Sequence, residues 1–558
     1  MLSWQLSFKV LFLHHLIINP KKITTFAPKS KHLYQMKRLF TIFLFVSCLL
    51  SLVAQRNRAM YFVFFHDKAH TPYSLSSPLD FLSQRAIDRR SRLNIPVDSA
   101  DIPVNPAYIS QVTATGASFY HSSRWMNGAL VYASDTQLQD ILALSFVDSA
   151  EMVRPAIPPR NVKSLKPHKN ADNIPVEISQ NAQIGADSLH YAGFRGRNIQ
   201  IAVIDAGFPG VNALPGFDSL RNRGGILGTY DFVNDTPFVY HEHYHGTMVL
   251  STMANNDPDE FVGTAPDADS WLFISEANGD YEEYLYEADL LTIAFEAADS
   301  VGADIVTASL GYFYTEDNNP DFCHENMNGT FFRSSRAATM AAERGMILCI
   351  AAGNEGDSYW HYIDTPADAD SILCIGGVDP DGYHSYFSSY GPTADGRVKP
   401  EVCARASYAV VVDPYYGTPT YSNGTSFATP ISAGAIASLL SALPDENPAV
   451  IRRTLLQTAS QANNPDNTLG YGILNVWRAY NKLNTEPLSL DETADRHIQT
   501  SFKDGYLNIL GYSGPFSLYD ISGKLLLTGF YDSPLHLPSL AHGLYLLRLS
   551  STTIKIIW

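Results

Sequence analysis

The region from about residue 185 to residue 483 alternates short apolar runs with longer helical segments, and this alternation restricts the fold more than any other feature. The apolar runs are rich in β-branched residues and cover residues 199–204, 304–309, 346–350 and 371–375. The helical segments cover residues 245–254, 282–301, 331–345 and 426–443. Strands that are apolar on both faces and are joined by crossover helices form a parallel sheet. The sequence therefore predicts a doubly wound α/β domain over residues 185–483.

Four polar residues in this region stand where a strand ends or a helix begins. Asp205 ends the first apolar run, and Asn354 follows the third. His245 opens one helical segment and Ser426 opens another. In doubly wound sheets, ligands bind beyond the carboxyl ends of the strands. We therefore expect an acid, an imidazole, an amide and a hydroxyl to meet in one crevice.

Each of these residues also has a simpler explanation when it is taken alone. An Asp after a strand often caps a turn, and a Ser at a helix start is usually an N-cap. The histidines of segment 241–245 (HEHYH) could hold a metal, although no carboxylate or thiolate pattern accompanies them. All four groups together favour nucleophilic catalysis, because a hydroxyl needs a base within hydrogen-bond reach.

The order of these residues resembles that of the subtilisin-like (subtilase, S8) serine proteases. The resemblance covers roughly residues 185–480, and its most specific motif is Gly424-Thr-Ser-Phe-Ala-Thr-Pro430. It implies a triad of Asp205, His245 and Ser426, in which the imidazole takes the proton of the hydroxyl. It also implies an oxyanion hole made by the Asn354 side chain and the Ser426 backbone N–H. The residues that it implies for substrate binding are Ser309, Leu310, Gly311, Ala352 and Gly353.

The same resemblance bears on ions and on the substrate. It implies no required cofactor, but calcium is common in this family as a structural ion. Loop 316–329 offers hard oxygen ligands, and a solvated loop is the simpler interpretation. Tyr312 and Phe313 beside the expected pocket suggest an apolar or aromatic substrate side chain.

Residues 56–153 form a separate pattern, which predicts a small α+β unit. Strands are expected at 60–65, 118–121, 128–133 and 146–153, with helices at 106–115 and 135–144. A further helix is expected from Ser77 as N-cap, with Pro78 in its first turn. The unit resembles the inhibitory propeptides of subtilases. Segment 154–184, rich in Pro, Lys and Asn, is interpreted as an exposed linker that is cut on activation.

Residues 1–55 contain seven basic residues and no acidic one. Met36-Lys37-Arg38 precedes the apolar run 39–50 and Ala54, a pattern typical of a secretory signal peptide over 36–54. The run is shorter than the roughly 20 residues that span a bilayer. Residues 1–35 are interpreted as a mis-set start. The prediction is a secreted or cell-surface protein with no membrane span after processing, and the alternatives are an uncleaved anchor or a lipid on Cys48.

The last segment, residues 500–558, predicts a small all-β sandwich. Strands at 516–521 and 525–530 flank the turn Ser522-Gly523-Lys524, and two more strands follow at 543–549 and 553–558. These residues resemble the sorting domain of the Bacteroidetes type IX secretion system, which implies the secretion machinery as a partner. A carbohydrate-binding β-domain is the alternative.

Composition and motif spacing exclude several other functions. A net charge of −17 argues against nucleic acid as a partner. The five cysteines contain no CxxC spacing, and Cys349 and Cys374 are expected to be buried in neighbouring strands. The segment 424–428 lacks the second glycine of G-x-S-x-G, which argues against an α/β-hydrolase esterase. We predict a secreted serine endopeptidase that cleaves polypeptides through an acyl-enzyme and is made as a zymogen. A non-catalytic adhesin or pseudoenzyme on the same scaffold is the alternative.

Overall fold

The computed structural model describes residues 58–156, 179–241, 243–277 and 283–485, and the β-strands between residues 499 and 557. The predicted signal peptide (36–54), residues 1–35 and most of the predicted linker (154–184) lie outside the described residues. The predicted domain boundaries stay predictions.

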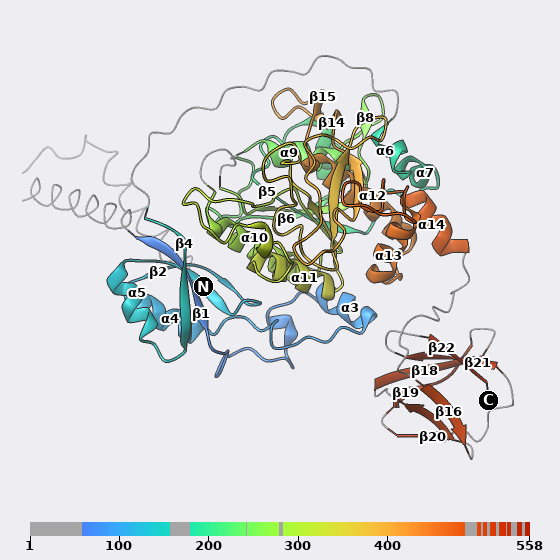
Figure 1. Cartoon of the computed structure of the whole chain (residues 1–558), viewed down its shortest axis with the longest axis horizontal. Coiled ribbons are helices and arrows are strands. Elements are labelled where there is room, and N and C mark those ends of the chain that lie inside the picture. The colour runs from blue at the N-terminus through green and yellow to red at the C-terminus, as the bar shows by residue number, and fades with distance from the viewer. Residues whose placement is uncertain are drawn as a thin grey trace, which may run out of the picture. The chain divides into compact units, whose positions relative to one another are not determined.

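A parallel sheet of seven strands forms the centre of residues 179–485 (Figure 1). Its strand order is β13-β12-β11-β10-β5-β9-β6, and every neighbouring pair is parallel. The strands are β5 (Gln200–Asp205), β6 (Ile226–Asp231), β9 (Asp269–Ile274), β10 (Ile305–Ala308), β11 (Ile347–Ala351), β12 (Leu373–Val378) and β13 (Val402–Arg405). The predicted doubly wound α/β fold is confirmed. Cys349 and Cys374 lie buried on the neighbouring strands β11 and β12, as predicted.

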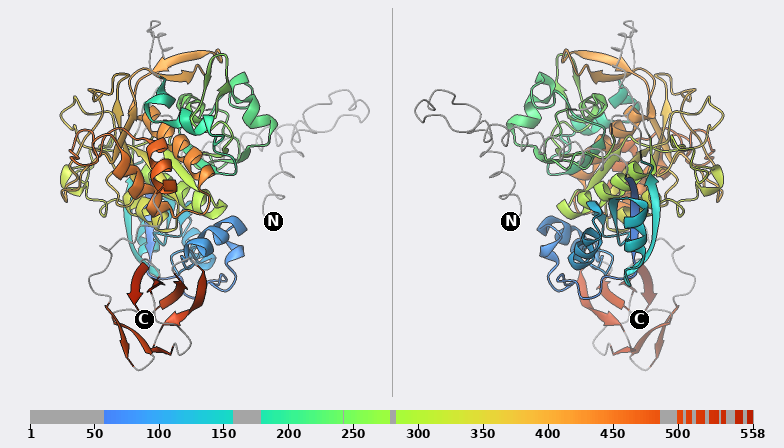
Figure 2. Two further views of the ribbon diagram at one scale, coloured as in Figure 1. Left: turned by 90° about the vertical axis from the view of Figure 1, so that its right-hand side faces the viewer. Right: turned by 90° about the vertical axis from the view of Figure 1, so that its left-hand side faces the viewer.

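Helices cover this sheet. The principal helices are α9 (His245–Ala254), α10 (Leu285–Val301), α11 (Arg333–Glu343), α12 (Thr425–Ala442), α13 (Pro448–Thr458) and α14 (Val476–Thr485). Helices α9 and α12 share one apolar core with residues of β5, β9 and β11. In Figure 2, α10 can be followed in yellow-green and α12 in orange. Among the described residues, α12 is the one helix long and apolar enough to cross a membrane, and 89% of that stretch is buried inside the protein.

The predicted α+β unit near the N-terminus is confirmed. Its antiparallel sheet has the order β2-β3-β1-β4 and packs against helices α4 and α5. The elements are β1 (Ala59–Phe65), α4 (Pro106–Ala114), β2 (Ser118–Ser123), β3 (Gly128–Ala133), α5 (Asp135–Leu142) and β4 (Val147–Arg154). Ser134 caps α5 in a reciprocal capping box with Gln137, which fixes where this helix begins.

The helix predicted from Ser77 begins later than expected. Ser77 precedes only a short 3-10 helix, η1 (Pro78–Asp80), and its side chain makes no capping hydrogen bond. The helix itself is α3 (Gln84–Leu93), and the hydroxyl of Ser83 accepts a hydrogen bond from the Ala86 N–H at 3.2 Å. The Ser77-Pro78 pair predicted the wrong start for the helix because it begins a single 3-10 turn, and Ser83 caps the α-helix that follows.

The C-terminal segment forms two small sheets that share one core. The first sheet contains β16 (Gln499–Lys503), β17 (Tyr506–Leu510) and β20 (Leu535–His536). The second contains β18 (Gly514–Asp520), β19 (Leu525–Tyr531), β21 (Leu544–Leu549) and β22 (Thr553–Ile557). Leu507 and Ile509 of the first sheet pack with Phe516, Leu518 and Leu547 of the second. This arrangement is the one expected for a β-sandwich.

Candidate active site

A buried hydrogen bond joins the end of β5 to the start of α9. Asp205 is 0% exposed, and its Oδ1 accepts a hydrogen bond from Nδ1 of His245 at 2.8 Å. The same oxygen accepts the N–H of Ala206 at 2.8 Å. The carboxylate therefore fixes both the orientation of the imidazole and the position of its Nδ1 proton.

Glycines allow this strand end and helix start to approach each other. A Cβ at Gly246 would collide with the carbonyl oxygen of Gly207 and would lie 3.0 Å from the Cβ of Asp205. A Cβ at Gly207 would collide with the carbonyl oxygen of His241. The glycines that follow Asp205 and His245 are thus needed for the contact between the two side chains.

Ser426 lies at the N-terminus of α12, where backbone N–H groups have no acceptor within the helix. Ser426 is 9% exposed, and its carbonyl oxygen accepts the hydroxyl of Ser309 at 2.7 Å. Oδ1 of Asn354 accepts the backbone N–H of Thr425 at 2.9 Å and its hydroxyl at 3.1 Å. Because the amide oxygen faces Thr425, the amide NH₂ of Asn354 is left to donate elsewhere.

One cavity of about 310 Å³ brings most of the predicted site residues together. His245, Asn354 and Ser426 line it, and the predicted substrate-binding residues Ser309, Leu310, Gly311 and Gly353 line it as well. The ring of His245 lies 5.8 Å from the ring of Phe427, the neighbour of Ser426. Asp205 lies behind His245 instead of on the cavity surface, and Ala352 is buried beneath the wall.

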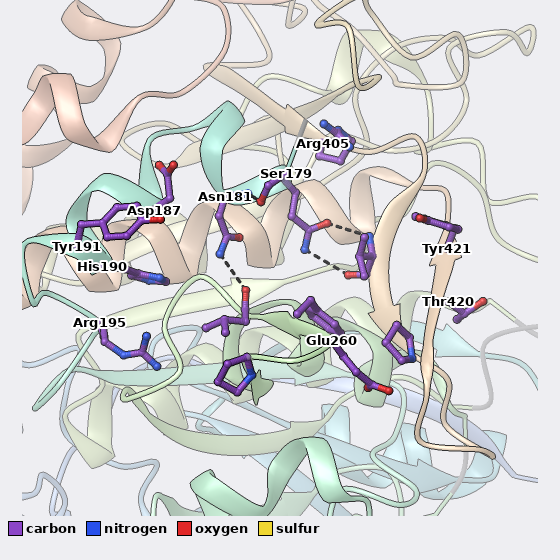
Figure 3. A pocket seen from close by; sticks show the side chains of 16 residues that line it. Ser179, Asn181, Asp187, His190, Tyr191, Arg195, Glu260, Arg405, Thr420 and Tyr421 are labelled. Atoms are coloured by element: carbon purple, nitrogen blue, oxygen red, sulfur yellow. Dashed lines mark hydrogen bonds between the residues drawn. The ribbon is translucent and has the colours of Figure 1, made fainter. Parts of the chain in front are cut away.

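A larger cavity, of about 830 Å³, contains none of these residues (Figure 3). The segment around residues 180–181 forms one wall of this larger cavity. Asn181 donates a hydrogen bond to the Val262 carbonyl at 2.8 Å, and Gln180 pairs with the backbone of Val410. Cavity size alone therefore does not locate the chemistry of this protein.

Two opposing effects act on His245. Burial disfavours the charged imidazolium, whereas the negative charges of Asp205 and Glu276 favour it. The carboxylates outweigh burial, and the pKa of His245 is raised above 6.5.

Four carboxyl side chains that no sequence pattern had singled out also line this cavity: Glu276, Glu283, Glu355 and Asp364. Burial raises the pKa of Glu276 to about 7, and that of Glu283 to about 8. The hydroxyl of Tyr312 donates to Oε2 of Glu276 at 2.9 Å. Glu276 comes two residues after β9, so the rule that selected Asp205 could have found it. Asp364 lies in an irregular segment and has no such signal.

Within the described part of the chain, no group of three or more His, Cys, Asp or Glu side chains could hold a metal ion. Two histidines of the HEHYH segment have separate carboxylate partners. Nε2 of His241 lies 3.3 Å from Oδ2 of Asp231, and His245 pairs with Asp205. Glu242 is outside the described residues. In loop 316–329, the side-chain oxygen of Asn328 already accepts the N–H groups of Thr330 and Phe331. Structural calcium stays a prediction.

Comparison with protein families matches most of the chain. A model of the subtilase family matches residues 196–472, and a model of the peptidase S8 propeptide domain of Bacteroidota matches residues 60–170. Subtilisin NAT of Bacillus subtilis subsp. natto is 30% identical over 318 residues, which cover 56% of this chain and 72% of that protein. Subtilisin-like protease SBT6.1 of Arabidopsis thaliana is 27% identical over 307 residues, or 52% of this chain and 26% of that longer protein.

Among solved structures, the prenylagaramide maturation protease PagA is similar, with a TM-score of 0.42 and 23% sequence identity. The match covers 54% of this chain and 99% of that one.

Replacing Gly246 with alanine is expected to break the contact between β5 and α9. The new Cβ would push the start of the helix away from Asp205, so we expect the free energy of unfolding to fall by about 1–3 kcal/mol. The low-field proton resonance of the His245–Asp205 hydrogen bond should disappear from the NMR spectrum.

Gly193→Ala is the control, because no atom lies within 4 Å of its new Cβ. It should cost about 1 kcal/mol through its positive φ and leave the low-field resonance in place. A Gly246→Ala protein with unchanged stability and an unchanged resonance would contradict the packing argument.

Proposed function

The chain belongs to the subtilase family of serine peptidases, and from this premise we propose that Asp205, His245 and Ser426 are its catalytic triad. The observation that carries the proposal is the buried 2.8 Å hydrogen bond between Asp205 and His245, beside a cavity that Ser426 and Asn354 also line. In this proposal, the protein is a secreted endopeptidase that hydrolyses peptide bonds through an acyl-enzyme.

The chemistry begins with the Ser426 hydroxyl, which is a weak nucleophile until a base removes its proton. Nε2 of His245 would accept that proton as the oxygen attacks the carbonyl carbon of the substrate. The imidazolium would then give the proton to the leaving amine, and the C–N bond would break. Water, deprotonated by His245, would hydrolyse the resulting ester and release the acid product. Asp205 would hold the imidazole in place and stabilise its charged form throughout.

Negative charge develops on the carbonyl oxygen when the tetrahedral intermediate forms. The NH₂ group of Asn354 and the backbone N–H of Ser426 are the donors that we propose for it, and the hydrogen bonds from Thr425 hold Asn354 ready. Donors that are already oriented need no reorganisation during the reaction, which is why they lower the barrier.

The segment before the catalytic domain supports synthesis as a zymogen. Three arginines of the N-terminal unit converge on Asp299 of α10: Arg89 at 2.6 Å, Arg90 at 2.7 Å and Arg124 at 2.6 Å. Asp299 is 0% exposed, and all three guanidinium groups are buried with it. On α10, the carboxylate of Glu296 also accepts the backbone N–H groups of Arg124 and Trp125. These contacts suit a propeptide that remains bound after its linker has been cut.

We propose export for this protein, followed by recognition of its C-terminal domain by the type IX secretion machinery. The support is the signal-like pattern in residues 36–54 and the two-sheet core formed by residues 499–557. We favour the peptidase over the adhesin or pseudoenzyme alternative because His245, Asn354 and Ser426 line one cavity and Asp205 pairs with His245.

A fluorophosphonate probe tests the proposed nucleophile. The protein with its linker cut and its propeptide removed should gain one covalent adduct on Ser426, detected by mass spectrometry, because only an activated serine reacts quickly. Ser426→Ala should give no adduct while keeping the same circular dichroism spectrum. A folded protein that has lost its propeptide and still does not react would favour the adhesin or pseudoenzyme alternative.

The raised pKa of His245 predicts how activity depends on pH. The base must be neutral to accept a proton, so activity is present above the pKa and is lost as the pH falls through it. We expect the acid limb of the kcat/KM profile to have its midpoint above pH 6.5. Glu276→Gln should move that midpoint slightly to lower pH, because Glu276, with a pKa of about 7, still carries part of a negative charge there that favours the imidazolium. Glu260→Gln, at an exposed position, is the control and should leave the midpoint where it is.

The arginine cluster predicts that Asp299→Asn weakens propeptide binding. In a Ser426→Ala background, the linker can be cut by limited trypsin digestion and the affinity of the two parts measured. The loss of this buried partner should raise the dissociation constant at least about 30-fold, since Arg89 and Arg124 lose the carboxylate that they contact and Arg90 keeps only Asp101. The control is Asp267→Asn, whose ion pair with Arg195 is partly exposed, and it should leave the affinity unchanged. Equal affinities for both variants would show that the buried cluster does not hold the propeptide.

A further inference from the structure

One wall of the cavity beside Ser426 contains carboxyl groups that the proposed mechanism does not use. Glu283, Glu355 and Asp364 line it, and no lysine or arginine among the described residues does so. The same described residues provide no metal-binding cluster for these carboxyl groups. The cavity therefore contains several carboxyl groups and, in the part of the chain that the structure describes, no lysine or arginine to pair with them.

Asp364 is the most buried of these carboxyl groups. It is 3% exposed, and its carboxyl group contacts the side chains of Glu355 and Trp360, but its Oδ1 has no hydrogen-bond partner among the described residues. Its backbone is fixed, because its N–H donates to the carbonyl oxygen of Ala352 at 3.1 Å. The next residue, Thr365, forms a two-way backbone pair with Tyr312 at 2.8 and 3.1 Å. A buried carboxyl oxygen that is held without a partner is costly, unless a ligand completes it.

The carboxyl group of Asp364 lies between two glycines of the substrate-binding segments. A Cβ at Gly311 would be 2.9 Å from the Cβ of Asp364, and a Cβ at Gly353 would collide with its Oδ2. Gly353 directly precedes Asn354, the proposed oxyanion donor. A substrate side chain that enters between these glycines therefore belongs to the residue whose carbonyl is attacked, the P1 residue.

We propose that this cavity selects substrates with lysine or arginine at P1, an inference that rests on the proposed peptidase function. The aliphatic stem of such a side chain would pack against Leu310 and Phe313, which also line the cavity. Its charged head would reach Asp364, with Glu355 and Glu283 nearby, and form charge-assisted hydrogen bonds.

The electrostatics of the carboxyl groups agree with this geometry. Burial and the neighbouring Glu355 raise the pKa of Asp364, and burial raises that of Glu283 to about 8. Without a cation Asp364 and Glu283 therefore favour their protonated forms, and a bound ammonium or guanidinium would favour their ionised forms. Tyr312, which suggested an apolar substrate, is 2% exposed, and its hydroxyl is bound to Glu276.

The chain also contains the kind of substrate that this pocket would accept. Its predicted linker contains four basic residues and no acidic residue between 155 and 171. The basic residues are Arg160, Lys163, Lys166 and Lys169. A zymogen that removes its own propeptide must cut in this segment, so opposite charges on pocket and linker suit each other.

The proposal is tested with the mature protein, after its linker has been cut and its propeptide removed, on peptide amides that differ only at P1. We expect kcat/KM for arginine and lysine to exceed that for phenylalanine about 100-fold, since a buried charge pair discriminates strongly. The proposal would be overturned if phenylalanine or leucine substrates had the same kcat/KM as arginine substrates.

Substitutions of the carboxyl residues in the cavity test whether these residues cause the preference for a basic P1 residue. Asp364→Asn should reduce the arginine-to-phenylalanine ratio of kcat/KM at least about 10-fold. Glu283→Gln should reduce it too, and it serves if the Asp364 variant fails to fold. Asp259→Asn, at an exposed site outside the cavity, is the matched control and should keep the wild-type ratio. A wild-type ratio in both pocket variants would overturn the assignment.

Fluorophosphonate labelling separates this proposal from the proposed function. A wild-type protein that is labelled at Ser426 but shows no preference for basic P1 residues would overturn the pocket assignment alone. A folded protein that is neither labelled nor active would overturn the peptidase function and, with it, this inference.

Discussion

The parallel register of the central sheet determines where every reactive group of the candidate site can lie. In this register Ile204 of β5 is level with Ala308 of β10, and Ala308 is level with Ile350 of β11. Asp205, Ser309 and Ala351, the residues that follow, therefore reach one edge of the sheet together. The chain leaves β5 toward β9 and β6 on one side and builds β10 to β13 on the other, so the crevice opens at this strand.

Two helix N-termini complete that edge. α9 brings His245 onto Asp205, which is possible because Gly246 and Gly207 have no side chains to separate them. α12 brings Ser426, and its first residue, Thr425, orients the amide of Asn354 through two hydrogen bonds. His245 and Ser426 both lie at the N-terminal end of a helix, where the helix dipole favours negative charge that develops on a bound substrate. Peptide bond hydrolysis creates charge of this kind.

Much of this arrangement could be predicted because its signals are local. Strand ends, helix starts and the motif around Ser426 are legible in short stretches of sequence, and they led to the parallel sheet and to residues that do line one cavity. The start of α3 was placed wrongly because two serines, Ser77 and Ser83, compete for the cap and only tertiary packing decides between them. Asp364 and Asp299 could not be found at all. Their importance depends on partners far away in sequence, such as the arginines that contact Asp299 across some 200 residues.

Asp299 and Asp364 both carry buried carboxyl groups, but the two groups have different partners. Asp299 is neutralised by three arginines that all come from the N-terminal unit. Asp364 receives no lysine or arginine within its cavity, and one of its oxygens stays unpartnered among the described residues. A buried charge is tolerated only when it is paired, so the first carboxylate needs the propeptide in place. When the propeptide leaves, Asp299 is opened to water, which can solvate it, whereas Asp364 remains enclosed. Asp364 therefore keeps its proton while the cavity is empty, and a basic substrate side chain would favour its ionised form.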